Sequence, residues 1–96
     1  MTGGLGRWTL DVRPRAQRQL ARLPEKTAAA VAEFMLGPLL DNPHRVGHPL
    51  RDEYAGQHSA RRGRDWRIRY RIDEDTSTVV VLDVSHRSDA YRDAGR

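Results

Sequence analysis

Cysteine is absent from this 96-residue sequence, and Lys26 is its only lysine. Without thiols the chain can form neither a disulfide nor a thiolate metal site, so we expect a reducing compartment, the cytoplasm. No apolar run approaches the length of a membrane span or a secretion signal, which predicts no membrane contact. The length fits a single domain over residues 1–96, in which the short glycine-rich start, residues 1–6, is expected to be flexible.

Common nucleotide-binding and hydrolase motifs are missing as well. The sequence has no glycine-rich phosphate loop and no serine nucleophile elbow, and nothing in it predicts a cofactor. His44 and His48 have the four-residue spacing of a metal pair on a helix, but Pro43, Gly47 and Pro49 argue against a regular helix there. Because no third ligand is evident, we predict no metal site.

What the sequence has in excess is arginine, concentrated in one segment. The net charge of the chain is +4, and its pI is about 10.3. Between His58 and Arg71 lie six arginines and one acid, Asp65, so this segment carries +5 and the remainder of the chain is nearly neutral. A guanidinium group binds phosphate through two parallel hydrogen bonds. We therefore expect the segment to grip the backbone of a nucleic acid, most readily RNA.

Hydrophobic periodicity predicts an α+β fold with the order β-α-α-β-β-β. The expected elements are a strand over 8–13, a helix over 14–23, a second helix from about 24 that kinks or ends at 37–38, a loop from 41, strands over 58–62, 66–72 and 78–84, and a short helical or irregular end over 85–92. The last strand is apolar on both faces, which places it inside the sheet. The result is a small, twisted, mainly antiparallel sheet with the two N-terminal helices packed on one face.

The arginine-rich strand has two different faces. Apolar residues at 66, 68, 70 and 72 alternate with arginines at 67, 69 and 71, so we expect helices over the apolar side and solvent over the arginine side. A three-residue loop over 63–65 would place Arg61 opposite Arg67, whereas a two-residue loop would place Arg62 there. We favour the first and keep both. A merely solvated strand face is the alternative, but like charges on neighbouring strands repel by roughly a few tenths of a kcal/mol per pair, which favours a bound anion.

Proton transfer on such a surface would need other residues, because arginine stays protonated at any working pH. His86, at the end of the last strand, and Tyr91 beyond it are the candidates, with Glu53 as a further acid. A lone histidine near a strand end is more often structural than catalytic, so a structural role for His86 stays open. His58 alternates with Ser59 and is expected to point toward the apolar side, which makes it a weaker candidate.

Six segments have an order and spacing that point to a known family. They are 22–26 (RLPEK), 37–43 (GPLLDNP), 49–51 (PLR), 56–63 (GQHSARRG), 66–70 (WRIRY) and 84–91 (VSHRSDAY). Together they resemble the RelE/ParE superfamily of bacterial toxins, and within it the RelE branch, from Trp8 to Arg92. The resemblance implies a RelE-like fold and the toxin of a type II toxin–antitoxin pair.

RelE-like toxins enter the ribosomal A site and cut the mRNA there without a metal, through attack of the 2′-OH on the adjacent phosphate. The resemblance therefore implies an endoribonuclease that inhibits translation. Arg67 matches the family's strand arginine at the scissile phosphate, and the preceding strand has arginines where family members often have lysines. The implied catalytic residues are Arg61, Arg67, His86, Arg87 and Tyr91, and the implied RNA-binding residues are Arg51, His58, Arg62, Arg64, Arg69 and Arg71.

The competing interpretation on the same fold is a ParE-type toxin that poisons DNA gyrase without cutting nucleic acid. The dense arginine face beside His86 and Tyr91 favours RNA cleavage, and an inactive member that only binds its antitoxin is a third possibility. Because a free toxin would be lethal, the resemblance implies a cognate antitoxin, RelB-like or of another type II class, in addition to the ribosome and mRNA. We expect the antitoxin to wrap the toxin with a partly helical tail that folds as it binds.

Overall fold

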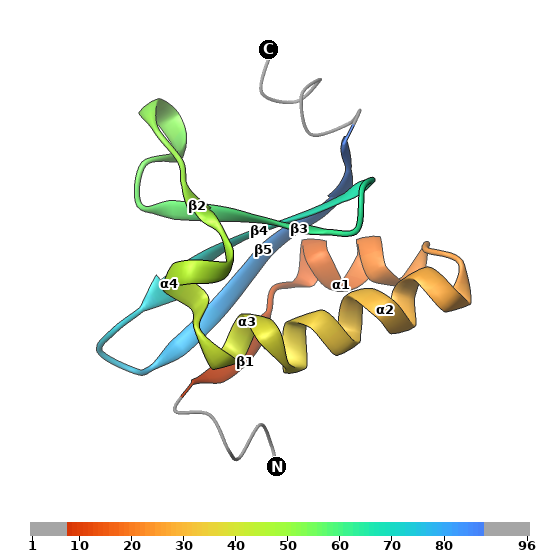
Figure 1. The fold of residues 1–96 in the computed structure, drawn as a ribbon, viewed down its shortest axis with the longest axis horizontal. Helices are drawn as coiled ribbons and strands as arrows, with labels where there is room; N and C mark the ends of the chain where they lie inside the picture. Colours follow the sequence, from red (N-terminus) through yellow and green to blue (C-terminus); the bar gives the residue numbers. More distant parts are fainter. Residues whose placement is uncertain (1–7, 88–96) are drawn as a thin grey trace.

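The computed structural model describes residues 8–87, and its elements follow the predicted order with four additions, α3, α4, β2 and η1. The elements are β1 (Thr9–Val12), α1 (Pro14–Ala21), α2 (Glu25–Leu36), α3 (Pro38–Asp41), α4 (Pro43–Val46), β2 (His48–Pro49), the 3-10 helix η1 (Asp52–Tyr54), β3 (Gln57–Arg62), β4 (Trp66–Asp73) and β5 (Thr78–His86). Figure 1 shows the helices on one side of a twisted sheet, so the predicted α+β class is confirmed.

The additional elements fill most of the segment between α2 and β3. Pro38 and Pro43 are each the first residue of a one-turn helix, a position where the missing N–H of proline costs no hydrogen bond. The helix that begins at Pro43 ends at Val46 and His48 lies in β2, so His44 and His48 do not share a helix, as predicted. The next residues form β2, which extends the sheet by one short strand.

The sheet has the strand order β1-β5-β4-β3-β2, in which β1 is parallel to β5 and the other neighbours are antiparallel. β5 lies between β1 and β4, as its apolar character on both faces predicted. β2 is two residues long and pairs with β3 only at His58 and Ser59. Within the described chain, the other residues of β3 have no strand partner on the edge that faces β2.

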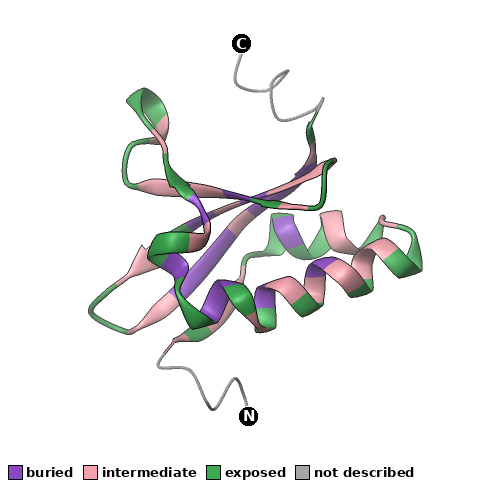
Figure 2. Ribbon diagram, in the orientation of Figure 1, coloured by how far each residue is buried: buried purple, intermediate pink, exposed green. Residues whose placement is uncertain are grey.

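The hydrophobic core lies between the sheet and the helices. Ile68 and Tyr70 on β4 are fully buried, and so are Ala16 of α1, Val31 of α2 and Leu39 of α3. Figure 2 shows the buried residues in β4, in β5 and in the helices that cover them. This confirms that the helices cover the apolar side of β4. By alternation, the arginines of β4 point to the opposite side.

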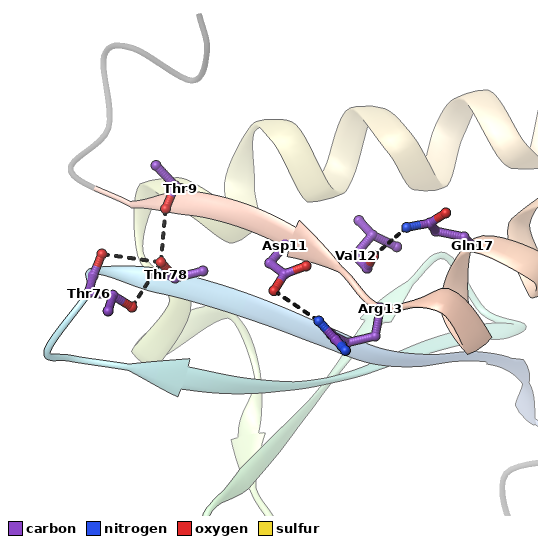
Figure 3. A network of polar contacts seen from close by, with 7 residues as sticks. All are labelled: Thr9, Asp11, Val12, Arg13, Gln17, Thr76 and Thr78. Atoms are coloured by element: carbon purple, nitrogen blue, oxygen red, sulfur yellow. Dashed lines mark hydrogen bonds and ion pairs between the residues drawn. The ribbon is translucent and has the colours of Figure 1, made fainter.

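The parallel pair of β1 and β5 is closed by a chain of hydroxyl groups, drawn in Figure 3. The Oγ1 atoms of Thr9 and Thr78 are 3.0 Å apart, and Thr76 Oγ1 donates to Thr78 Oγ1 at 3.0 Å. At the other end of β1, Gln17 Nε2 donates to the Val12 carbonyl at 2.8 Å. These bonds fix both ends of β1 and set the start of α1 along the sheet.

Beyond Val12, α1 takes the place of a strand partner for β5. The Gln19 side chain bonds two groups at this edge: its Oε1 accepts the Val84 amide N–H at 2.7 Å, and its Nε2 donates to Asp83 Oδ1 at 2.8 Å. Arg15 Nε lies 3.1 Å from the same carboxylate oxygen, which belongs to a buried residue. The buried Asp83 carboxylate is thereby hydrogen-bonded and charge-balanced, and α1 is anchored to β5.

One extra residue in β5 changes which side chains face the core. Arg69 pairs with Asp83 while Tyr70 pairs with Val81, so Leu82 forms a β-bulge. A bulge reverses the alternation of a strand. Val81 before it and Val84 after it therefore both face the helices.

Candidate nucleic-acid interface

The hairpin of β3 and β4 closes through the three-residue loop 63–65. Gly63 adopts φ +68°, a left-handed conformation that glycine accepts without strain. Arg61 is therefore paired with Arg67, as the favoured register predicted, and the two-residue loop is wrong. Arg61 is exposed and Arg67 is half-buried. The two guanidinium groups project from neighbouring strands on the face away from the helices.

We define the arginine face by rows of directly paired residues, because paired residues project to the same side of a sheet. Each row contains one arginine of β4, and the second row begins on β2. The rows are Arg61–Arg67–Ser85, His48–Ser59–Arg69–Asp83 and Gln57–Arg71–Val80. The acid of the second row is already balanced by Arg15, so the face is strongly positive.

Arg69 is held in place by the loop between β2 and β3. Its Nη1 donates to Gln57 Oε1 at 2.7 Å, and its guanidinium carbon lies 4.9 Å from the centre of the Tyr54 ring. Figure 1 shows this loop on the side of the sheet away from the helices. An aromatic ring beside a cation is a common platform for a nucleobase. Tyr54 was not predicted, because nothing in its local sequence indicates that its loop folds back over β4.

Arg87 lies at the hairpin end of the arginine face. Its amide donates to the Asp65 carbonyl at 2.7 Å, and its Nε lies 3.7 Å from Asp65 Oδ1. Arg64, in the same loop as Asp65, is exposed. Arg51, at the start of η1, and Arg71, on β4, are exposed too. Tyr91, which was predicted to belong to the site, lies outside the described residues.

Two residues expected to bind RNA lie on the helix side instead. Arg62 Nε donates to the Ala30 carbonyl of α2 at 3.3 Å. His58 stacks on Tyr70, with ring centres 5.5 Å apart. Alternation along β3 is the reason, since both residues are one position away from those that face the solvent side. Neither side chain belongs to the arginine face.

His86 also lies on the helix side. It pairs with Trp66, and their rings meet edge to face with centres 5.3 Å apart. The expectation that His86 lies beside the arginine face is therefore wrong. The cause is the bulge at Leu82, because uninterrupted alternation from Val81 would have placed His86 on the other side.

His58 and Tyr70 mark the packed junction between β2, β3 and α4. Burial, and to a lesser degree the charge of nearby His44, lower the pKa of His58. Burial raises the pKa of Tyr70 to about 12, so its hydroxyl stays protonated and donates to the Pro43 carbonyl at 2.6 Å. A Cβ added to Gly47 would lie 2.5 Å from the Tyr70 hydroxyl and 2.7 Å from the Ser59 carbonyl oxygen. Only glycine fits here, and β2 is therefore seated closely against β3.

A groove of about 380 Å³ borders the arginine face where β3 approaches α2. One side of the groove is formed by Glu33, Phe34 and Pro38, and the other by Arg61, Arg62 and Gly63 of the hairpin. Leu36, between these two apolar residues in sequence, is 57% exposed. Within residues 8–87, no group of three or more His, Asp or Glu side chains is placed to hold a metal ion, and no helix is long and apolar enough to cross a membrane.

Similarity to known proteins places the chain in a family. A family model described as the ParE toxin of the type II toxin–antitoxin system parDE matches residues 10–91. From Mycobacterium tuberculosis (strain ATCC 25618 / H37Rv), Toxin RelE is 54% identical over 77 residues, 80% of this chain and 78% of the relative, and Toxin RelG is 51% identical over 85 residues, 88% and 97%. A chain in the crystal structure of the toxin–antitoxin complex RelBE2 from the same species is 51% identical, with a TM-score of 0.78 over 82% of this chain and 96% of that one. This chain therefore belongs to the ParE/RelE family of toxins of type II toxin–antitoxin systems.

Proposed function

We propose that this chain is a ribosome-dependent mRNA endonuclease, which stops translation in the cytoplasm as the toxin of its pair. The observation that carries the proposal is the direct pairing of Arg61 with Arg67 on the sheet face away from the helices. Two facing guanidinium groups repel each other unless an anion lies between them. An RNA phosphate is an anion whose oxygens can accept hydrogen bonds from both.

In the proposed reaction, the 2′-oxygen of one nucleotide attacks the adjacent phosphorus, and the bond from phosphorus to the next nucleotide's 5′-oxygen breaks. Negative charge accumulates on the non-bridging oxygens of the phosphorane between these steps. Arg61 and Arg67 would stabilise that charge by hydrogen bonds already oriented before reaction. The 2′-OH must also lose a proton and the 5′-oxygen must gain one, and arginine cannot accept a proton.

The remaining cations would hold the RNA on either side of the scissile phosphate. Arg69 and Arg71 continue along β4, Arg64 lies in the hairpin loop, Arg87 contacts Asp65 of the same loop, and Arg51 precedes η1. Contacts between such cations and phosphates release counterions, so affinity for RNA should fall steeply with salt. Contacts to phosphates carry no sequence information, so the ribosome and the codon it holds, rather than these arginines, would select the cleavage site.

We also propose that a cognate antitoxin, RelB-like or of another type II class, binds and neutralises this chain. The RelBE2 relative is a toxin–antitoxin complex by its description. In this chain the exposed Leu36 and the groove between Phe34, Pro38 and Arg61 offer an apolar contact next to a cation. We call the pair of Arg61 and Arg67 the phosphate clamp. An antitoxin tail that buried Leu36 and placed a carboxylate on Arg61 would make one of these two arginines unavailable to RNA.

The test is cleavage of a defined mRNA in a cell-free translation reaction, mapped by primer extension. Wild-type protein should cut ribosome-bound mRNA and spare the same RNA without ribosomes. Arg67→Ala should slow cleavage by about 10²–10³-fold, as for the loss of one oxyanion donor. Arg22→Ala, which removes an exposed arginine at the end of α1 far along the chain from the face, is the matched control and should cut normally. Undiminished cleavage by Arg67→Ala would overturn the assignment.

Inhibition of DNA gyrase is the second candidate, because the matching family model is described as a ParE toxin. A gyrase inhibitor would need a protein-binding surface but no group for proton transfer. Loss of supercoiling activity in a purified gyrase reaction, with ribosome-bound mRNA left intact, would favour this second function over the first.

A further inference from the structure

RNA cleavage on the arginine face needs a residue that accepts a proton, because arginine cannot. The positions of the histidines show which of them lies on that face. His58 and His86 pack against Tyr70 and Trp66 on the helix side. His44 meets the Trp8 ring at 5.5 Å and lies 2.6 Å from a carboxylate oxygen of Glu74. Within residues 8–87, the histidine that remains is His48.

Two independent observations place His48 on the arginine face. It pairs directly with Ser59, which in turn pairs with Arg69, so the three side chains project from the same side. Next to it, a Cβ on Gly47 would point at the Tyr70 hydroxyl in the core. Since successive residues of a strand point to opposite sides, the His48 side chain points away from the core. It is also exposed.

The backbone that carries His48 is firmly held. The close seat of Gly47 against β3 fixes one side, and the Leu50 amide donates to the Gln57 carbonyl at 2.8 Å on the other. A catalytic side chain needs a rigidly held backbone, because an error of about 1 Å in its position strongly lowers the reaction rate. The two-residue strand β2 therefore does more than extend the sheet. It fixes the backbone position from which the His48 imidazole projects.

His48 is close to the phosphate clamp. Arg61 lies two residues beyond Ser59 on β3, so it is the diagonal neighbour of His48, and such neighbours are about 7–8 Å apart. Both side chains are long enough to meet at one phosphodiester between them. Arg69, on the same row as His48, is oriented by its hydrogen bond to Gln57 and by the Tyr54 ring.

We propose that His48 is the general base of the RNA cleavage reaction, an inference that rests on the proposed function. The neutral imidazole takes the proton of the 2′-OH as the 2′-oxygen bonds to phosphorus. The bond to the 5′-oxygen then breaks, leaving a 2′,3′-cyclic phosphate and a 5′-OH. One proton leaves the 2′-oxygen and one reaches the 5′-oxygen from the imidazolium or from solvent, so the step balances.

The base is the role that the arginines leave open. A guanidinium can donate hydrogen bonds to the departing 5′-oxygen, but it cannot accept a proton from the 2′-OH. Imidazole accepts and returns protons near neutral pH. The charged residues on the segments next to β2 are Arg61 on β3, Arg69 on β4, Arg45 at the end of α4 and, in the segment between β2 and β3, Arg51, Asp52 and Glu53. Among these, Glu53 is the rival base.

The experiment measures single-turnover cleavage of mRNA on programmed ribosomes across the pH range in which imidazole titrates. Wild-type protein should lose rate on the acid side as its base becomes protonated. His48→Gln should cut at least about 100-fold more slowly at neutral pH and should lose that acid limb. His48→Lys should recover part of the rate, with the limb moved to higher pH. His44→Gln, Glu53→Gln and His86→Gln should keep the wild-type profile.

Each result decides the inference. An unchanged acid limb in His48→Gln, or its loss in Glu53→Gln or His86→Gln instead, would overturn the assignment of His48 while leaving RNA cleavage in place. Loss of the alkaline limb in His48→Gln would overturn the role of base. Wild-type protein that cuts no ribosome-bound mRNA would overturn the proposed function together with this inference. Binding of each variant to the cognate antitoxin shows that it is folded.

Discussion

Replacing Arg61 by glutamine should slow RNA cleavage and at the same time stabilise the fold. Arg61 is exposed and lies directly opposite Arg67, so its charge opposes folding when the site is empty. Repulsion between such a pair is worth about 0.2–1 kcal/mol, and exposure to solvent favours the lower end of that range. Loss of a donor to the phosphorane should raise the activation barrier by about 2.7–4 kcal/mol. The two effects have opposite signs because a bound phosphate converts the repulsion into attraction.

Urea unfolding at two salt concentrations tests the electrostatic half of this prediction. The unfolding midpoint of Arg61→Gln should exceed that of wild type at low salt. The difference should shrink in 1 M salt, where the Debye length is about 3 Å instead of about 10 Å at 0.1 M. Single-turnover cleavage on programmed ribosomes should show a rate reduced by about 10²–10³-fold.

Arg62→Gln is the matched control, since it removes the neighbouring arginine on the opposite face. Arg62 donates a hydrogen bond to the Ala30 carbonyl of α2, so this variant should be slightly less stable and should cleave normally. If Arg61→Gln were destabilised at low salt, or cleaved RNA as fast as wild type, the pair would not be a phosphate clamp.

Three further variants test other parts of the structure. Gln19→Ala should lower the free energy of unfolding by about 1–3 kcal/mol in urea, because it leaves the buried Val84 amide without a partner and removes one hydrogen bond of the Asp83 carboxylate, which Arg15 still contacts. An effect under about 1 kcal/mol would mean that water replaces the side chain. Tyr54→Ala should weaken RNA binding several-fold in a salt titration, because it removes the ring that orients Arg69, whereas Tyr54→Phe keeps the ring and should bind like wild type. Equal affinity for all three proteins would show that the Tyr54 ring has no part in RNA binding. Because burial lowers the pKa of His58 below its ordinary 6.5, the unfolded state binds more protons there, so its contribution to stability is fully present above that value and is lost as the pH falls through the folded pKa. In His58→Gln the unfolding midpoint should depend less on acid pH than in wild type, and parallel curves would contradict this.

Local patterns in the sequence were sufficient for the class of fold and for the charged half of the site. Alternation along β4 separates a core face from an arginine face because side chains of a strand alternate with a period of two. The glycine at position 63 accepts the left-handed turn that sets Arg61 opposite Arg67. These features depend only on neighbouring residues, so they survive without knowledge of the tertiary structure.

The small elements between α2 and β3 could not be predicted in this way. One-turn helices and a two-residue strand carry too few residues to show a period, and they are stabilised by contacts with distant parts of the chain. The seat of Gly47 against Tyr70 and Ser59 is such a contact. It decides that His48, which the sequence suggested only as half of a metal pair that we rejected, projects onto the arginine face.

By itself, the sequence determined the β-α-α-β-β-β order and the two faces of β4, because period-two alternation is local. It favoured the pairing of Arg61 with Arg67 over that of Arg62, and the structure decided between the two registers. Tertiary structure alone decided which histidine shares that face. The bulge at Leu82 arises where β5 changes its partner from β1 to α1, and it turns His86 toward the helices. The packing of β2 against β3 turns His48 outward. A single inserted residue reverses every later side chain of a strand, and only the complete sheet fixes where that residue lies.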